Sequence, residues 1–149
     1  MATRFAIYVV PDDEALFQRA SQWLGWDCVA ARLLDPPSGS ELANPAGISI
    51  TEVTATPRKY GFHGTIKPPF SLSDGTDETM LVERALEIAA ELSPVTLEAL
   101  EIRSIGGFMA LVPTDAGTAL GALAARFVTG LDEFRTPAEP SELARRRSA

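Results

Sequence analysis

The order of short segments along the chain constrains its fold most, because apolar runs rich in β-formers alternate with runs of helical periodicity. Residues 4–10, "RFAIYVV", are predicted to be a buried strand that ends at Pro11. Asp12 and Asp13 then favour the start of a helix that ends at Gly25. Its apolar residues, Leu16, Phe17, Ala20, Trp23 and Leu24, share one face. A strand followed by an amphipathic helix indicates a fold that mixes the two.

The middle of the chain continues this alternation. Residues 35–57 are rich in proline, glycine, serine and threonine and are predicted to be a long connection with room for one turn of helix. We expect a strand over residues 60–66, stopped by Pro68 and Pro69. A helix is predicted to begin at Asp77 and to stop before Pro94. Its apolar residues at helical spacing are Leu81, Ala85, Ile88, Ala89 and Leu92.

The last third of the chain predicts a hairpin and a helix. Residues 95–105 alternate as a strand with a change of phase that predicts a bulge near Ala99. Gly106 and Gly107 predict a tight turn into the next strand, "FMALVP". A helix is expected from about Asp115, with Leu120, Leu123, Ala124, Phe127, Val128, Leu131 and Phe134 on one face. The whole order predicts one α+β domain over residues 1–149, with a mostly antiparallel sheet packed on helices.

Composition excludes several classes of protein. Cys28 and His63 are the single cysteine and histidine, so an intramolecular disulfide and a zinc-type ligand cluster are excluded. We expect no cofactor or metal, although a phosphate substrate and carboxylates can recruit Mg²⁺. The formal net charge of −7 predicts no general nucleic-acid binding. Because neither a membrane-length apolar run nor a signal peptide is visible, we expect a cytoplasmic protein without a membrane partner.

Positive charge gathers around the histidine. Residues 54–70 contain Arg58, Lys59 and Lys67 and no acidic residue, and a second basic group, Arg145–Arg147, lies near the C-terminus. A basic stripe in an acidic protein indicates a small anionic ligand. The alternative is that three cations over this length are ordinary solvated surface.

The predicted strand around His63 has a polar face. On a strand, Gly61, His63, Thr65 and Lys67 would alternate onto one side, with His63 and Thr65 roughly 7 Å apart. A neutral imidazole can accept a proton from a nucleophile, the threonine hydroxyl can donate to a phosphate oxygen, and Lys67 or Arg58 can add positive charge. The alternative is that His63 is a hydrogen-bonded structural residue and Thr65 simply a good strand former.

The stretch "PRKYGFHGTIKPPF", residues 57–70, resembles the first signature of the 2H phosphoesterase superfamily, and the chain is most similar to its DUF1045 branch of phosphonate-metabolism proteins. "RFAIYVVP", "GGFMALVP" and "DEFRTPAEPSELARRR" resemble that branch in the same order. The resemblance implies a bilobal, LigT-like α+β fold in which two His-x-Thr motifs face each other across a cleft. One histidine acts as base and the other as acid, the threonines hold the phosphate, and no metal is needed.

In this chain His63 and Thr65 match the first motif and are the predicted catalytic residues, while Lys67, Arg58 and Tyr60 are the predicted substrate-binding residues. The chain reaches Ala149 with no second His-x-Thr. We therefore expect the C-terminal part of the fold to be missing. The resemblance predicts a metal-independent hydrolase of a cyclic or other small phosphodiester or phosphonate. Two alternatives stay open: an inactive member that binds such a ligand, and an interaction module that forms a homodimer through an uncovered sheet edge.

Overall fold

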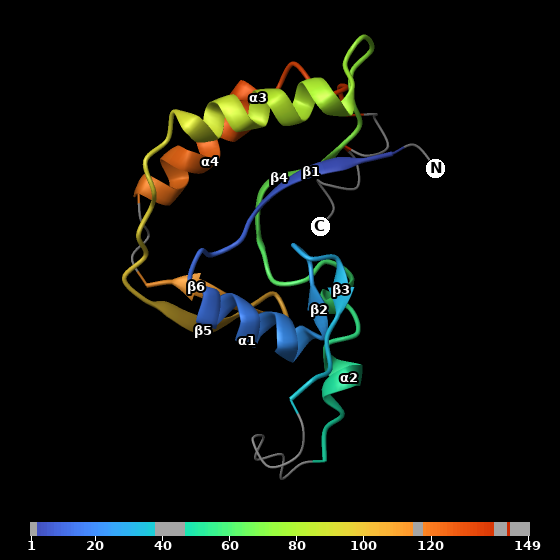
Figure 1. Cartoon of the computed structure of the whole chain (residues 1–149), viewed down its shortest axis with the longest axis vertical. Coiled ribbons are helices and arrows are strands. Elements are labelled where there is room, and N and C mark those ends of the chain that lie inside the picture. Colours follow the sequence, from blue (N-terminus) through green and yellow to red (C-terminus); the bar gives the residue numbers. More distant parts are fainter. Residues whose placement is uncertain (1–2, 38–46, 115–117, 139–142, 144–149) are drawn as a thin grey trace. The chain divides into compact units, whose positions relative to one another are not determined.

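The structure, a computed structural model, describes residues 3–37, 47–114, 118–138 and 143. The chain forms two compact units. The first, Tyr8–Thr65, contains the histidine and is called the histidine unit. The second, Met1–Ile7 with Ile66–Ala149, contains the main hydrophobic cluster and is called the core unit. In the described residues the strands form two-stranded sheets, β1–β4, β2–β3 and β5–β6 (Figure 1). The predicted mixture of helices and antiparallel strands is confirmed, although the strands form small separate sheets.

Strand β1, Phe5–Val9, is the strand predicted before Pro11, and it pairs with β4, Gly64–Phe70. The predicted burial of β1 is wrong, since its residues are half-buried or exposed. The predicted bounds of β4 are wrong, since it begins four residues later than expected and continues through both prolines. Gly61 has φ +77°, which interrupts any extended strand at that position. In the described sheet β4 has β1 as its single neighbour. Because successive residues of a strand direct their N–H groups to opposite sides, one of the two prolines faces the open side of β4, where no N–H donor is needed.

The first helix of the histidine unit is α1, Glu14–Leu24, as predicted. The Asp13 carboxylate accepts from the Leu16 N–H, and Gly25 ends the helix with φ +78°. A short antiparallel pair follows, β2, Trp26–Asp27, with β3, Arg32–Leu33. The sequence did not predict this pair, because two-residue strands carry no periodicity. The long connection then contains α2, Ile50–Val53, and a 3₁₀ turn, η2, Pro57–Lys59.

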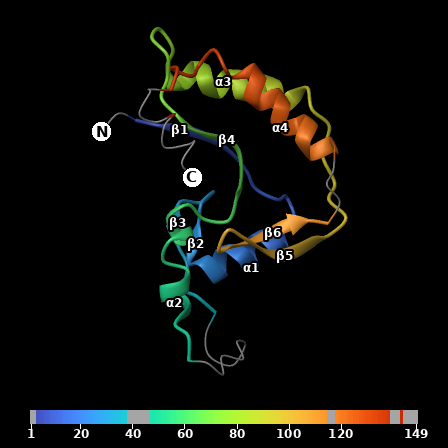
Figure 2. The same ribbon diagram turned by 180° about the vertical axis from the view of Figure 1, so that it is seen from behind.

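The core unit is built on two helices that lie side by side in Figures 1 and 2. Helix α3, Glu78–Ala90, is capped by Asp77, whose carboxylate accepts from the Met80 N–H. Helix α4 spans Thr118–Gly130, and Asp115, its predicted start, lies outside the described residues. The buried apolar cluster comprises Phe70, Leu81, Ile88, Leu131 and Phe134. Leu131 and Phe134 were predicted on the helix, but they follow its end.

A hairpin completes the core unit, formed by β5, Leu100–Ile105, and β6, Phe108–Pro113. Gly106 and Gly107 have φ +55° and +83°, so the turn has the left-handed conformation at both central residues that suits a two-residue hairpin. The predicted turn is confirmed. The longer strand and its bulge are wrong, because residues 95–99 lie outside the ladder and the change of phase marks where β5 begins.

Two further predictions concerned a membrane span and the basic group near the C-terminus. None of the helices in the described residues is long and apolar enough to cross a membrane. The basic group Arg145–Arg147 lies outside the described residues.

Candidate functional site

The His63 side chain is held by the backbone just upstream of it. His63 directly precedes β4 and is half-buried. Its Nδ1 lies 3.0 Å from the carbonyl oxygen of Gly61. A carbonyl oxygen can only accept, so Nδ1 carries the proton and donates. In the neutral ring Nε2 is therefore unprotonated, and it is the atom able to accept a proton.

Nε2 of His63 lies 3.3 Å from the hydroxyl oxygen of Thr65. Because neutral Nε2 has a lone pair and no proton, the Thr65 hydroxyl is the donor. Because Thr65 is exposed, its hydroxyl can leave Nε2 and donate instead to a ligand that arrives from solvent. The structure thus places the proton-accepting atom of the chain's one histidine beside a hydroxyl that can bind an oxyanion.

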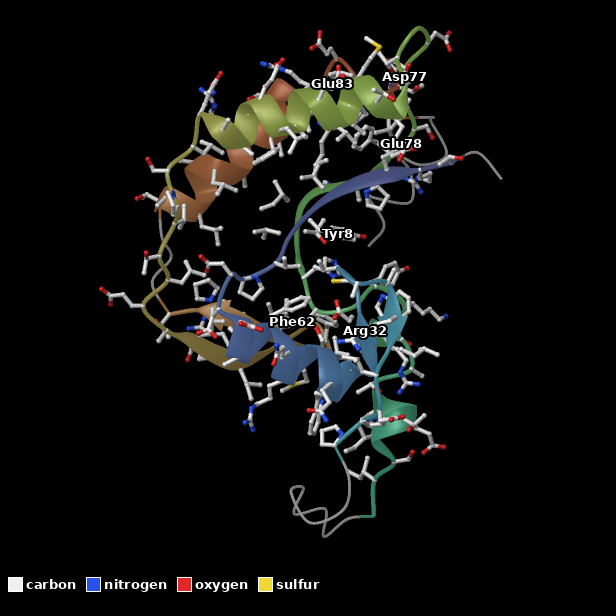
Figure 3. All side chains as sticks on the ribbon, in the orientation of Figure 1. Tyr8, Arg32, Phe62, Asp77, Glu78 and Glu83 are labelled. Carbon is white, nitrogen blue, oxygen red and sulfur yellow. The ribbon has the colours of Figure 1, made fainter. Side chains whose placement is uncertain are left out.

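Two tyrosine rings lie near the imidazole. The Tyr8 ring, labelled in Figure 3, comes from β1, and its centroid lies 3.9 Å from that of His63 at an interplanar angle of 33°. The Tyr60 ring lies 6.4 Å away at 53° and is exposed. Tyr8 limits the orientation of the imidazole by stacking on it. Tyr8 could not be predicted from the sequence, because its position beside His63 depends on the pairing of β1 with β4.

A glycine makes the backbone turn that carries His63 possible. Gly61 is buried, and a Cβ there would lie 2.7 Å from Cβ of Cys28 and 3.1 Å from Cδ1 of Trp26. The thiol of Cys28 donates to the carbonyl oxygen of Phe62 at 3.6 Å. Phe62 is labelled in Figure 3. The β2–β3 pair therefore sets the path of residues 61–62, and with it the carbonyl that orients His63.

Cys28 itself is a poor nucleophile in this position. Burial raises the pKa of its thiol above the ordinary value of 9.0, a hydrogen bond with backbone lowers it, and the charge of Asp27 raises it further. Since the thiolate is the reactive form of cysteine, a raised pKa disfavours reactivity at neutral pH. Its interactions make it a structural residue.

Arg58 binds backbone and side chain within the histidine unit. Its Nε donates to the carbonyl oxygen of Leu24 at 2.8 Å, and its Nη2 donates to Thr54 Oγ1 at 2.7 Å and to the carbonyl oxygen of Thr51 at 3.3 Å. A cation at the C-terminal end of α1 also interacts favourably with the helix dipole. These bonds tie α1 to the α2 region, and a contact of Arg58 with substrate stays a prediction.

Lys67 belongs to the core unit and is 3% exposed. Its Nζ donates to the carbonyl oxygen of Val128 at 2.8 Å and lies 3.5 Å from Oδ1 of Asp132. The same ammonium lies 5.5 Å from the centroid of the Phe70 ring. A buried ammonium with these partners stabilises the end of α4. The predicted role of Lys67 toward a ligand is untested, and these contacts do not favour it.

The structure therefore brings together three predicted residues, His63, Thr65 and Tyr60, and adds Tyr8. Within the described residues, no group of three or more His, Cys, Asp or Glu side chains could hold a metal ion. The chemical capacity of the site is one proton acceptor, one hydroxyl and two aromatic rings.

A family model described as "Protein of unknown function (DUF1045)" matches residues 65–149, more than half of the chain. The chain belongs to this family. The matched range begins at Thr65, two residues after His63. No solved structure matches the chain, so the LigT-like arrangement of lobes stays a prediction.

Two curated relatives carry the name "Ribose 1,5-bisphosphate phosphokinase PhnN". The one from Janthinobacterium sp. (strain Marseille) is 36% identical over 151 residues, covering 99% of this chain and 32% of that protein. The one from Laribacter hongkongensis (strain HLHK9) is 30% identical over 143 residues, covering 91% of this chain and 32% of that protein. The chain thus spans about a third of the length of these relatives.

Proposed function

We propose that this chain carries the first half-site of a metal-independent 2H-type phosphoesterase that acts on a small cyclic or linear phosphodiester. The proposal rests on the hydrogen bonds of the two imidazole nitrogens of His63. Nδ1 is held by the Gly61 carbonyl, and Nε2 is left unprotonated beside the Thr65 hydroxyl. This is the arrangement that a general base and a phosphate-binding hydroxyl require.

In the proposed step, Nε2 of His63 accepts the proton of a water or hydroxyl nucleophile as that oxygen attacks phosphorus. The Thr65 hydroxyl, released from Nε2, donates to a non-bridging phosphate oxygen, where negative charge increases in the transition state. The Gly61 carbonyl stabilises the imidazolium, because Nδ1 keeps its proton throughout. The stacked ring of Tyr8 keeps the imidazole from rotating away from the nucleophile.

The leaving oxygen needs a second proton donor, and one histidine supplies only one of the two proton transfers. Two phenols lie near the imidazole, Tyr8 and Tyr60, with ring centroids 3.9 Å and 6.4 Å from that of His63. Lysine and tyrosine side chains ordinarily lose their proton only at about pH 10, which matches neutral pH poorly. The second donor is therefore proposed to come from another part of a longer polypeptide or from a second subunit.

The relatives support a phosphorylated substrate and a place in phosphonate metabolism. Their shared name specifies a phosphorylated sugar, ribose 1,5-bisphosphate, as the molecule they act on. Their named activity, phosphoryl transfer, is not what we propose for this chain. Its sequence has no G-x-x-x-x-G-K-[ST] loop of the kind that holds nucleotide phosphates in many phosphotransferases.

A second candidate function is a binding half-site without turnover, and the presence of a single histidine favours it. Both candidates bind phosphate at His63 and Thr65. They differ in whether the bound ester is cleaved.

Hydrolysis separates the two candidates. We would measure cleavage of 2′,3′-cyclic, 1,2-cyclic and linear phosphodiesters with EDTA present, comparing the chain with His63→Ala and His63→Gln. The glutamine variant keeps a polar side chain of similar length but cannot shuttle a proton. EDTA-resistant cleavage lost in both variants is expected of the esterase. Cleavage that persists in either folded variant would overturn the role of His63.

Ligand binding tests the half-site directly, because the one imidazole gives one set of histidine resonances in NMR. Inorganic phosphate is expected to shift these resonances and to do so weakly in Thr65→Val. Binding without cleavage would establish the second candidate. Resonances that stay in place under saturating phosphate and under every ester would contradict both.

A further inference from the structure

The β5–β6 hairpin of the core unit exposes several large apolar side chains to solvent. Ile102 is 70% exposed and Met109 62%, and they lie on one face because Ile102 pairs with Leu111 and Ser104 with Met109. An isolated two-stranded hairpin is marginally stable in water. A third strand alongside β5 would extend the ladder and cover part of this surface.

The outer edge of β5 has backbone groups ready for such a strand. Ile105 and Phe108 are opposite each other on either side of the two-residue turn. In a turn of this length the two flanking residues form a hydrogen-bonded pair. Because bonded and non-bonded pairs alternate along an antiparallel ladder, the N–H and C=O groups of Leu100, Ile102 and Ser104 point away from β6. In the described part of the chain, β5 has no second neighbour in its sheet.

The sequence of β5 is complementary to itself across this edge. In an antiparallel pairing of two β5 strands centred on Ile102, the outward backbone groups of Ile102 meet those of Ile102 in the second copy, and Leu100 meets Ser104. The same register places Glu101 opposite Arg103 of the second copy, twice across the two-fold axis. We propose that two copies of this chain pair through β5 in this register, giving a four-stranded sheet of order β6-β5-β5-β6.

Charge is what favours a second copy as the occupant of this edge. Glu101 and Arg103 already form an ion pair within one strand, with exposed side chains on the same face. Opposite charges at directly facing positions stabilise an antiparallel pair, and like charges destabilise it. An unrelated strand would need a basic residue opposite Glu101 and an acidic residue opposite Arg103. A second copy of β5 supplies both by symmetry.

The experiment is a charge swap measured by sedimentation equilibrium from micromolar to millimolar protein. The wild-type mass is expected to rise with concentration from 15.9 kDa toward twice that value. Glu101→Arg places Arg opposite Arg, and Arg103→Glu places Glu opposite Glu. Each single variant is expected to raise the dissociation constant roughly tenfold or more. The double variant Glu101→Arg/Arg103→Glu restores opposite charges and is expected to dimerise like the wild type.

Mixing the two single variants gives the sharpest result, because a heterodimer again places Arg opposite Glu at both sites. The mixture is expected to dimerise about as tightly as the wild type, although each component alone dimerises roughly tenfold more weakly or worse. A wild type that stays monomeric at millimolar concentration would overturn the proposal. So would single variants that dimerise as well as the wild type, since a dimer of that kind would use another surface. Circular dichroism of each variant checks that loss of dimer is not loss of fold.

Discussion

Gly61 lies so close to Cys28 that a Cβ at position 61 would stand 2.7 Å from Cβ of Cys28. The backbone of Gly61 also has φ +77°, a conformation that L-residues with a side chain disfavour. Its carbonyl accepts the Nδ1 hydrogen of His63 at 3.0 Å. One residue therefore joins the packing of the histidine unit to the tautomer of the imidazole.

Gly61→Ala is expected to lower the free energy of unfolding by roughly 2–4 kcal/mol. About 1–2 kcal/mol comes from the left-handed backbone and the rest from the clash with Cys28 and Trp26. Urea denaturation followed by fluorescence measures the loss.

Gly75→Ala is the matched control for this change. Gly75 has φ +82°, but a Cβ there would meet no atom within 4 Å. It is expected to cost only about 1–2 kcal/mol, the backbone part alone. Equal losses in the two variants would show that the contact between Gly61 and Cys28 is not a steric constraint.

Lys67 provides a second prediction, because its ammonium is buried while its partner Asp132 is largely exposed. Lys67→Met keeps the volume of the side chain but removes the donor to the Val128 carbonyl. We expect a loss of about 1 kcal/mol. Lys67→Ala also removes the stem that packs near Phe70 and is expected to cost about 2–3 kcal/mol.

Thermal or urea unfolding of the two Lys67 variants measures both losses. If Lys67→Met is as stable as the wild type, the hydrogen bond and ion pair contribute nothing net, and the side chain acts only by packing.

The acid dependence of stability provides a third prediction. A hydrogen bond from Arg135, the charge of Arg135 and the charge of Lys67 hold the pKa of Asp132 below its ordinary value of 3.8. The unfolded chain therefore binds the proton more readily than the folded chain. The stabilisation is present above about pH 4 and is lost as pH falls through the lowered folded value.

Asp132→Asn is expected to lower stability at pH 7 and to flatten its decrease below about pH 4. Urea midpoints from neutral to acidic pH test this. An unchanged acid slope in Asp132→Asn would contradict the assignment.

Much of the fold could be predicted from local sequence signals. Asp13 and Gly25 bound α1, Asp77 begins α3, and the Gly106–Gly107 turn closes the hairpin, since caps and turns act through a few neighbouring residues. The start of β4 could not be predicted, because "YGFHGTI" alternates like a strand. Its interruption depends on the left-handed conformation of Gly61 and on packing against Cys28, which is remote in sequence.

Some residues of the candidate site could also be predicted from local sequence, and others could not. His63 and Thr65 could be predicted as partners because they are two residues apart in sequence. Lys67 continues the same alternation in the sequence, yet its ammonium binds the Val128 carbonyl, 61 residues away in the chain. Tyr8 could not be predicted, since no local pattern indicates which residue of β1 stacks on the imidazole.

The tautomer of His63 is the fourth prediction and the one closest to function. Nitrogen NMR of the neutral imidazole is expected to show the proton on Nδ1 and an unprotonated Nε2, because Gly61 offers only an acceptor. Free imidazole in water favours no such arrangement by itself, so a dominant Nδ1–H form reports the protein bond. A dominant Nε2–H form would overturn the role of Nε2 as base.

Variants of Thr65 test the hydrogen bond from its hydroxyl to Nε2 of His63. Thr65→Ser keeps the hydroxyl and is expected to leave the Nε2 resonance near its wild-type position. Thr65→Val keeps the branched shape and removes the donor, so the Nε2 resonance is expected to move toward that of an imidazole nitrogen accepting only from water. If Thr65→Val and Thr65→Ser gave the same resonance, the 3.3 Å contact would not be a hydrogen bond in solution. A role of Thr65 in catalysis would then rest on its contact with phosphate alone.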